Sequence, residues 1–173
     1  MKKILPLVAA ALLLTTSLAR AQSATGTTSV QVTVDAEASI TINTSPTTLT
    51  TAGTVFNNYT GATSFTYKIR TKKTGGNGTI TVLFSDDLKS GFDTILLSNL
   101  TYGSTVGAPG SGVSAGTATS KTTGTTVATF TTDNHSADAG TGSNTVNWTL
   151  VNNPSYTTGS YSATATFTIS SSL

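Results

Sequence analysis

Residues 30–42 read Val-Gln-Val-Thr-Val-Asp-Ala-Glu-Ala-Ser-Ile-Thr-Ile, with an apolar side chain at every even position and a polar one at every odd position. Strict alternation of this kind is the pattern of a β-strand that buries one of its two faces. The run is thirteen residues long, whereas strands in globular proteins usually have about 5–6. We therefore expect its two halves to have different roles.

The break between the halves is expected at Asp35-Ala36-Glu37, where a small apolar side chain lies between two charges. The second half, with Ile40 and Ile42, is predicted to be buried in its own domain. The first half is predicted to form a strand that either crosses to another sheet of the same domain or is donated to a neighbouring molecule. Its candidate assembly residues are Val30, Val32 and Val34.

Residues 1–21 have the pattern of a secretory signal peptide. Lys2 and Lys3 precede an apolar stretch, and Ala19-Arg20-Ala21 places small residues before a cleavage site at Ala21–Gln22. The apolar stretch is shorter than the roughly 20 residues of a membrane-spanning helix, so we expect a secreted, periplasmic or cell-surface protein. Removing Lys2, Lys3 and Arg20 from the nine basic residues leaves six against seven acidic ones, a net charge of −1. That balance argues against nucleic acid as a partner.

The expected mature chain, residues 22–173, has the size of one domain and the composition of an all-β protein. It has a single Glu, no Cys and no helical repeat of apolar residues. Several short runs alternate as strands do, which predicts a single antiparallel immunoglobulin-like β-sandwich of about 7–9 strands. The runs are centred on Phe65–Ile69, Ile80–Phe84, Ile95–Tyr102, Val127–Thr131, Val146–Leu150 and Tyr161–Ile169.

Two connecting segments are informative. Gly75-Gly76-Asn77-Gly78 tolerates the backbone angles of a tight turn and predicts a hairpin between the strands on either side. Residues 103–126 are rich in Gly, Ser, Thr and Ala without apolar alternation, which predicts a long loop, with room for a short edge strand.

The titratable residues do not form a recognisable catalytic or metal-binding motif. Asp133, His135 and Ser136 have the side chains of a hydrolase triad, but no G-x-S-x-G sequence supplies a nucleophile, and a polar turn explains them equally well. We therefore predict no enzyme activity, no catalytic residue and no cofactor. The spacing of a calcium loop is also absent, which leaves open whether calcium binds at Asp86, Asp87, Asp93, Asp133 or Asp138.

Four of the six basic residues of the mature chain gather in one short stretch: Lys68, Arg70, Lys72 and Lys73. The first three alternate and so point to one face of a strand. They would bind an anionic partner such as a glycan, or they would form the solvated face of an edge strand, where Lys discourages unwanted pairing. Trp148 lies between Val146 and Leu150 on one face and is predicted to be in the core.

The layout resembles the pilin-like subunits of chaperone–usher pili and the related spore-coat-U-type domains. The resemblance is carried by the alternating run 30–42 after a signal peptide and by the strand Tyr161–Ile169, preceded by Gly159. It implies a subunit that lacks one strand and accepts the N-terminal extension of the next subunit. The chain departs from that family in having no cysteine and in ending Ser171-Ser172-Leu173.

The sequence thus predicts a non-enzymatic, exported structural or adhesive protein. In one interpretation it is a pilus or filament subunit that self-associates or joins other surface subunits through residues 30–42. In the alternative it is a stand-alone extracellular module that binds carbohydrate or another surface. No residue is assigned to metal or cofactor binding in either interpretation.

Overall fold

A computed structural model describes residues 24–53, 55–118 and 121–172. The chain divides into two units, Met1–Thr33 and Val34–Leu173. The expected signal peptide lies outside the described residues. The described part is all-β and antiparallel, with one 3₁₀ turn, η1 (Leu97–Asn99), and no α-helix. Its strands are β1 (Glu37–Ile42), β2 (Thr50–Thr51), β3 (Tyr59–Arg70), β4 (Gly78–Phe84), β5 (Leu88–Ser90), β6 (Asp93–Ile95), β7 (Leu100–Thr105), β8 (Ser111–Gly112), β9 (Gly116–Thr117), β10 (Thr125–Phe130), β11 (Thr141–Leu150) and β12 (Ala165–Ser171).

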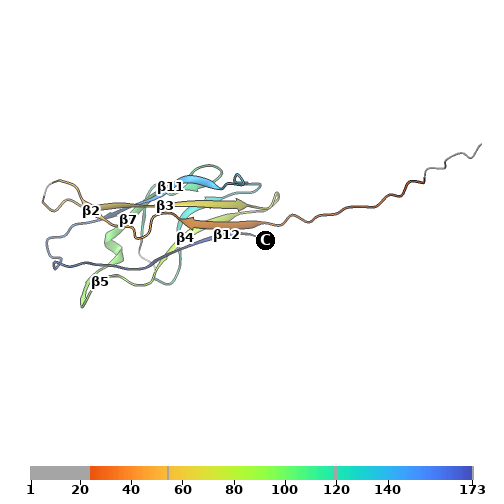
Figure 1. Cartoon of the computed structure of the whole chain (residues 1–173). Helices are drawn as coiled ribbons and strands as arrows, with labels where there is room; N and C mark the ends of the chain where they lie inside the picture. The colour runs from red at the N-terminus through yellow and green to blue at the C-terminus, as the bar shows by residue number, and fades with distance from the viewer. Residues whose placement is uncertain (1–23, 54, 119–120, 173) are drawn as a thin grey trace, which may run out of the picture. The chain divides into compact units, whose positions relative to one another are not determined.

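The strands of the larger unit form three sheets. The largest has the order β1-β3-β11-β7-β9, with β2 also paired to β3. The second has the order β12-β4-β10-β8, and β5 and β6 form a two-stranded ribbon. In Figure 1 the long strands β3 and β11 lie above β4 and β12 as two layers. β1 and β12, which end their respective sheets, lie close to one another.

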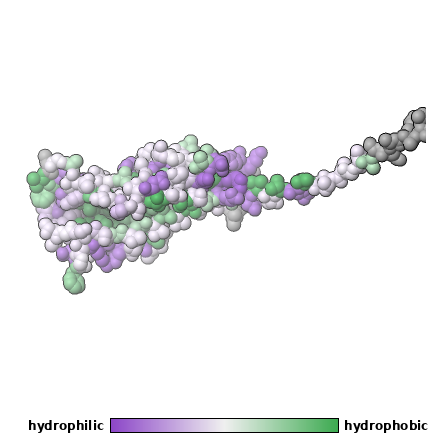
Figure 2. Space-filling view, in the orientation of Figure 1, coloured by the Kyte–Doolittle hydropathy of each residue, from purple (hydrophilic) through white to green (hydrophobic). Residues whose placement is uncertain are grey.

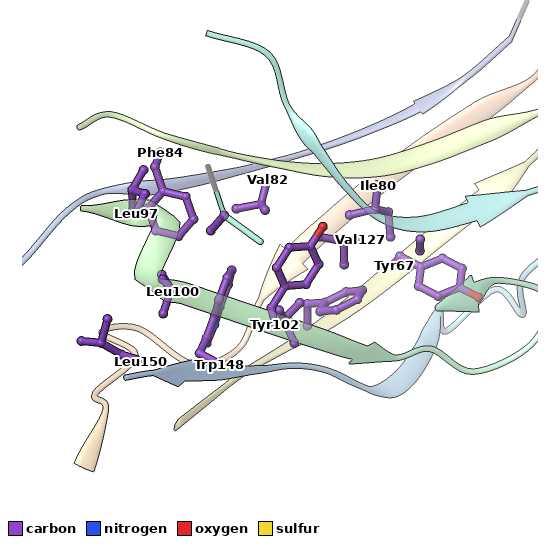
Figure 3. Close-up of a cluster of buried hydrophobic side chains, with 14 of the residues drawn as sticks. Tyr67, Ile80, Val82, Phe84, Leu97, Leu100, Tyr102, Val127, Trp148 and Leu150 are labelled. Carbon is purple, nitrogen blue, oxygen red and sulfur yellow. The ribbon is translucent and has the colours of Figure 1, made fainter. Parts of the chain in front are cut away.

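The core lies between the two larger sheets and is built from the alternating positions that the sequence indicates. Phe65, Tyr67 and Ile69 of β3 are buried, and their polar neighbours along the strand face outward. Figure 3 shows aromatic and aliphatic side chains of both sheets meeting in this layer. Tyr67 contacts Phe130 edge-on at 5.1 Å between ring centroids, and Phe84 contacts Trp148 in the same way at 5.6 Å. The predicted core position of Trp148, only 4% exposed, is confirmed.

The hairpin predicted at residues 75–78 is wrong. β3 pairs with β1 and β11, whereas β4 pairs with β12 and β10. The turn therefore carries the chain from one sheet to the other. Gly75 adopts the positive φ of 69° that a tight turn favours, and Gly76 allows a close approach, because a Cβ there would clash with the carbonyl oxygen of Lys72.

Other strand limits differ from the sequence pattern. The last strand is Ala165–Ser171, shorter at its start than the alternation 161–169. The expected strand 95–102 is divided among β6, η1 and β7. The segment 103–126 contains the end of β7, two two-residue strands and the start of β10; β8 and β9 each lie at the end of a sheet.

The N-terminal run forms a strand only in its second half. β1 covers Glu37–Ile42, and residues 24–36 have no regular secondary structure. Ile40 is half-buried against the core, but Ile42 is 36% exposed, so its predicted burial is wrong. The side chains of Val30, Val32 and Val34 are 94%, 84% and 62% exposed. The first half therefore does not cross into another sheet of this chain.

Candidate functional site

A groove of about 1200 Å³ lies in the larger unit, between two segments that are far apart in sequence. One wall is formed by residues 42–49, which leave β1, and the other by residues 152–165, which lead into β12. The floor is the core itself, with Phe84, Leu100 and Trp148 among the lining residues. The groove thus exposes part of the core at the edge where the two sheets meet.

The groove is open because the residues entering β12 have small side chains. The core-facing positions of this segment are Tyr161, Ala163, Ala165 and Phe167, all half-buried. Ala163 and Ala165 carry only a methyl group, whereas the core-facing positions of β3 and β4 carry mostly aromatic or branched side chains. Because protein interiors are close-packed, this missing volume leaves a space beside the core that the described residues do not fill.

One edge of β12 has backbone groups without a strand partner. Ser162 exchanges two backbone hydrogen bonds of 3.0 Å with Lys89, and the amide of Ser85 donates to the carbonyl of Thr164 at 2.9 Å. Even-numbered residues thus pair toward β4 and β5. In an antiparallel ladder alternate residues point their amides and carbonyls in opposite directions. The free edge is therefore formed by odd-numbered residues, among them Ala163, Ala165 and Phe167, and no strand among the described residues pairs with it.

The opposite wall is held to β3. The amide of Asn43 donates to the carbonyl of Ser64 at 2.8 Å, and the hydroxyls of Thr47 and Thr63 are 2.6 Å apart. Gly61 allows this close approach, because a Cβ there would lie 2.5 Å from the carbonyl oxygen of Thr48. Because both walls are fastened to their own sheets, the groove is a pre-formed feature of the unit.

The groove is uncharged. Among the described residues that line it, none is Asp, Glu, Lys, Arg or His. Tyr156 belongs to the lining, and burial raises the pKa of its hydroxyl. The free backbone edge of β12 offers hydrogen bonds, and the floor offers apolar surface. An extended, uncharged segment with alternate apolar side chains satisfies both requirements.

The candidate assembly residues Val30, Val32 and Val34 are an accessible segment of this type. They are exposed, and they alternate with Gln31 and Thr33 without a charge between them. Val34 belongs to the larger unit, and the other two belong to the smaller one.

The basic residues do not lie on an edge strand, so that interpretation is wrong. Lys68 and Arg70 are on the outer face of β3, which is flanked by β1 and β11, and Lys72 and Lys73 are in the turn that follows. Arg70 forms an ion pair of 3.0 Å with Glu37, and its Nε donates to the carbonyl of Asp35 at 2.7 Å. In the described part of the chain no ion pair involves the three lysines.

His135 and Asp133 form an exposed pair, with Nε2 of the imidazole 2.9 Å from the carboxylate. The hydroxyl of Ser136 accepts a hydrogen bond of 2.9 Å from the amide of Ile69. The serine thus supports the backbone of β3 and forms no hydrogen bond with the histidine.

The acidic residues raised as calcium ligands lie in different surroundings. Asp86 pairs with Lys89, and Asp87 pairs with Lys121 at 2.7 Å. Hydrogen bonds from these lysines lower the pKa of both carboxyl groups. Asp93 accepts from the hydroxyl of Thr157 at 3.4 Å. No group of three or more His, Asp or Glu side chains in the described ranges is placed to hold a metal ion.

Sequence reasoning found the exposed valines but missed the groove. The available signal was the pair Ala163 and Ala165 within a strand pattern that otherwise carries large apolar side chains. The alternation shows that both face the core, but the volume that they leave open depends on Phe84 and Trp148, which come from other strands.

Comparison with protein-family models, with curated proteins and with solved structures gave no match. Among the described residues, no helix has the length and apolar character needed to cross a membrane.

Proposed function

We propose that the chain is an exported, non-enzymatic structural subunit that assembles by β-strand addition. In this proposal the larger unit is an immunoglobulin-like β-sandwich with one strand position open, and residues 30–34 of another copy fill it. The observation that carries the proposal is the uncharged groove beside the free edge of β12, in a chain that also has exposed valines at alternate positions.

The donated segment fits along part of the groove. Residues 30–34 span about 16 Å when extended, the length of residues 163–167 within a longer groove wall. Three valines would face a free edge whose inward side chains are Ala163, Ala165 and Phe167. Branched side chains would then occupy the space beside two alanines. Fully burying a Val side chain contributes roughly 1.5–3 kcal/mol, and three such side chains would offset part of the entropy lost on association.

The register of the chain favours donation to another copy over filling of its own groove. If residues 30–34 turned back on β1 through Asp35-Ala36, Val34 would lie opposite Glu37 and Val30 opposite Thr41. The groove wall begins only at Ile42. A segment of the same chain would thus end before the groove, whereas a segment from another copy enters it without that limit.

The proposal is tested with the full chain carrying Val30→Thr, Val32→Thr and Val34→Thr, which keeps the strand propensity but removes apolar surface. The matched control changes Gln31 and Thr33 to Ser on the other face. We expect the parent and the control to form ordered oligomers in sedimentation, and the triple variant to remain monomeric.

A synthetic peptide of residues 24–36 supplies the second measurement. It should bind the monomeric triple variant and raise its thermal midpoint, and a peptide with the three Thr substitutions should not. A parent protein that stays monomeric and does not bind the peptide would overturn the proposal. If that monomer instead retained a glycan, the carbohydrate-binding alternative would be favoured.

A further inference from the structure

The two ends of the larger unit have different surfaces. The groove end carries residues 43–49, 52–53, 55–58 and 151–164, and the linker end carries the start of β1, the turn 71–77 and the end of β12. The twelve-residue strand β3 runs from one end to the other (Figure 1). Outside residues 30–42, the large apolar side chains that are exposed in the described part are all near the groove end: Val55, Phe56, Phe92, Leu96 and Val151.

These apolar side chains are presented on protruding loops. Phe92, at the turn of the β5–β6 ribbon, is fully exposed, and Phe56 is 56% exposed. Val55 and Phe56 also line the groove. In Figure 2 apolar colour marks protruding parts of this end, whereas hydrophilic colour gathers at the opposite end of the larger unit, where β3 ends. Gathering of exposed apolar side chains at one end of a domain favours a contact with another molecule at that end.

The segment that joins the donated strand to its own domain is very short. Only Asp35 and Ala36 separate Val34 from the first residue of β1. Three Cα–Cα steps of 3.8 Å place Glu37 at most about 11 Å from Val34. Wherever residues 30–34 are inserted in a groove, the linker end of the donor must therefore stand at that groove's opening.

Arg70 further restricts the movement of this short connection. Its Nε donates to the carbonyl of Asp35 at 2.7 Å, and its Nη2 pairs with the carboxylate of Glu37 at 3.0 Å. The guanidinium thus holds residue 35 against the outer face of the donor domain, because its Nε and Nη2 contact two neighbouring residues at once. The residue next to the inserted strand is held by the domain and does not act as a free tether.

We infer that assembled copies dock end to end as rigid neighbours, with the linker end of the donor, held by Arg70, covering the apolar loops at the groove end of the acceptor. This inference rests on the proposed function, and it names a second contact surface besides the groove. The donor contributes Lys72 and Lys73, which are exposed beside Arg70. The aliphatic stems of lysines cover apolar surface, and their ammonium groups are attracted to aromatic faces. Phe56 and Phe92 of the acceptor are suitable partners for both interactions.

The test uses Arg70→Met in the full chain, which keeps an unbranched apolar stem but removes the donors to Asp35. Lys68→Met is the matched control, because it removes one positive charge from the same face of β3 without contact to the linker. A second variant, Phe92→Ser, removes acceptor surface outside the groove lining; this side chain is fully exposed, and an unchanged thermal midpoint will show that the fold is kept.

We expect Arg70→Met and Phe92→Ser each to raise the concentration needed for assembly by at least about tenfold, as for truncation of interface anchor residues. Filaments of Arg70→Met should also bend more in electron micrographs than those of Lys68→Met. Binding of peptide 24–36 should be unchanged when each change is made in the Val→Thr monomer, because the peptide carries no second domain.

The outcomes separate the two proposals. If the peptide binds and both variants assemble like the parent, neighbours are joined by the strand alone and the end-to-end contact is wrong. If the parent neither assembles nor binds the peptide, strand addition itself fails. If only the Phe variant is impaired, Arg70 does not position the linker, and rigid end-to-end docking through Arg70 is overturned.

Discussion

The rings of Phe65 on β3 and Phe167 on β12 stack with their centroids 6.4 Å apart. This contact joins the two sheets at the inner limit of the groove, because Phe167 belongs to the groove lining and Ile169, two residues further along β12, does not. Between Phe167 and Tyr161 the same face of the chain carries only two alanines. The groove thus begins where the contact between Phe65 and Phe167 ends and the side chains of Ala163 and Ala165 leave space at the edge of the core.

Filling this space from within the chain should separate stability from assembly. In Ala165→Leu the new side chain would occupy the volume that a donated valine is proposed to fill. We expect the free energy of unfolding to stay constant or rise by up to about 1–2 kcal/mol, and binding of peptide 24–36 to be lost. Urea denaturation and calorimetric titration measure the two effects. Thr166→Leu adds similar volume on the outer face and should leave peptide binding intact; equal binding by Ala165→Leu would contradict the position of the groove.

The hydroxyl of Thr63 connects the core to the groove wall. It accepts a hydrogen bond of 2.9 Å from the indole of Trp148 and lies 2.6 Å from the hydroxyl of Thr47. Thr63→Val keeps the shape but leaves the buried indole N–H without this partner, which should lower the free energy of unfolding by about 1–3 kcal/mol. Thr60→Val, at an exposed position of the same strand, should change it by less than about 0.5 kcal/mol. Equal effects of the two changes would argue against the hydrogen bond.

Asn144 is fully buried and holds the irregular part of β11. Its Nδ2 donates to the carbonyls of Phe65 and Thr141, and its Oδ1 accepts from the amide of Gly107 at 2.9 Å. Asn144→Ala would remove one buried and two part-buried hydrogen bonds to the backbone. We expect a loss of about 3 kcal/mol or more in urea denaturation. Asn147→Ala, exposed on the same strand, is the control, and a similarly small loss at both positions would show that water replaces the amide.

Acid should weaken the contacts of Asp87. The hydrogen bond from Lys121, and then that from the amide of Leu97, lower its carboxyl pKa from 3.8. A group whose pKa is lower in the folded state adds stability above its unfolded pKa and loses it as the pH falls through the folded one. The contribution of Asp87 should therefore be constant from neutral pH to about pH 5, decrease as the pH falls past 3.8 and vanish only below the lowered pKa of the folded state. The difference in urea midpoint between the parent and Asp87→Asn should be small, because the pair is near the surface, and should shrink in this acid range. A difference that grows on acidification would contradict this sign.

The faces of the main strands were predictable from the sequence. Alternate residues of a strand point to opposite sides whatever strand lies beside it. The burial of Ile80, Val82 and Phe84 therefore follows from spacing alone, as does that of Val146, Trp148 and Leu150. The all-β, antiparallel class follows in the same way from the turns between such runs. Those inferences need only local geometry.

The pairing of the strands and the position of the groove depend on the tertiary structure. The turn 75–78 permits a hairpin, but β3 and β4 belong to separate sheets, and their buried side chains meet in one core. Val30, Val32 and Val34 share the alternation of Ile40, yet only the isoleucine packs on this chain's core. The groove depends on the volumes of Ala163 and Ala165 relative to Phe84 and Trp148, which meet only after folding. A local pattern specifies which way a side chain points, whereas the partner that it meets depends on chain segments brought together from a distance.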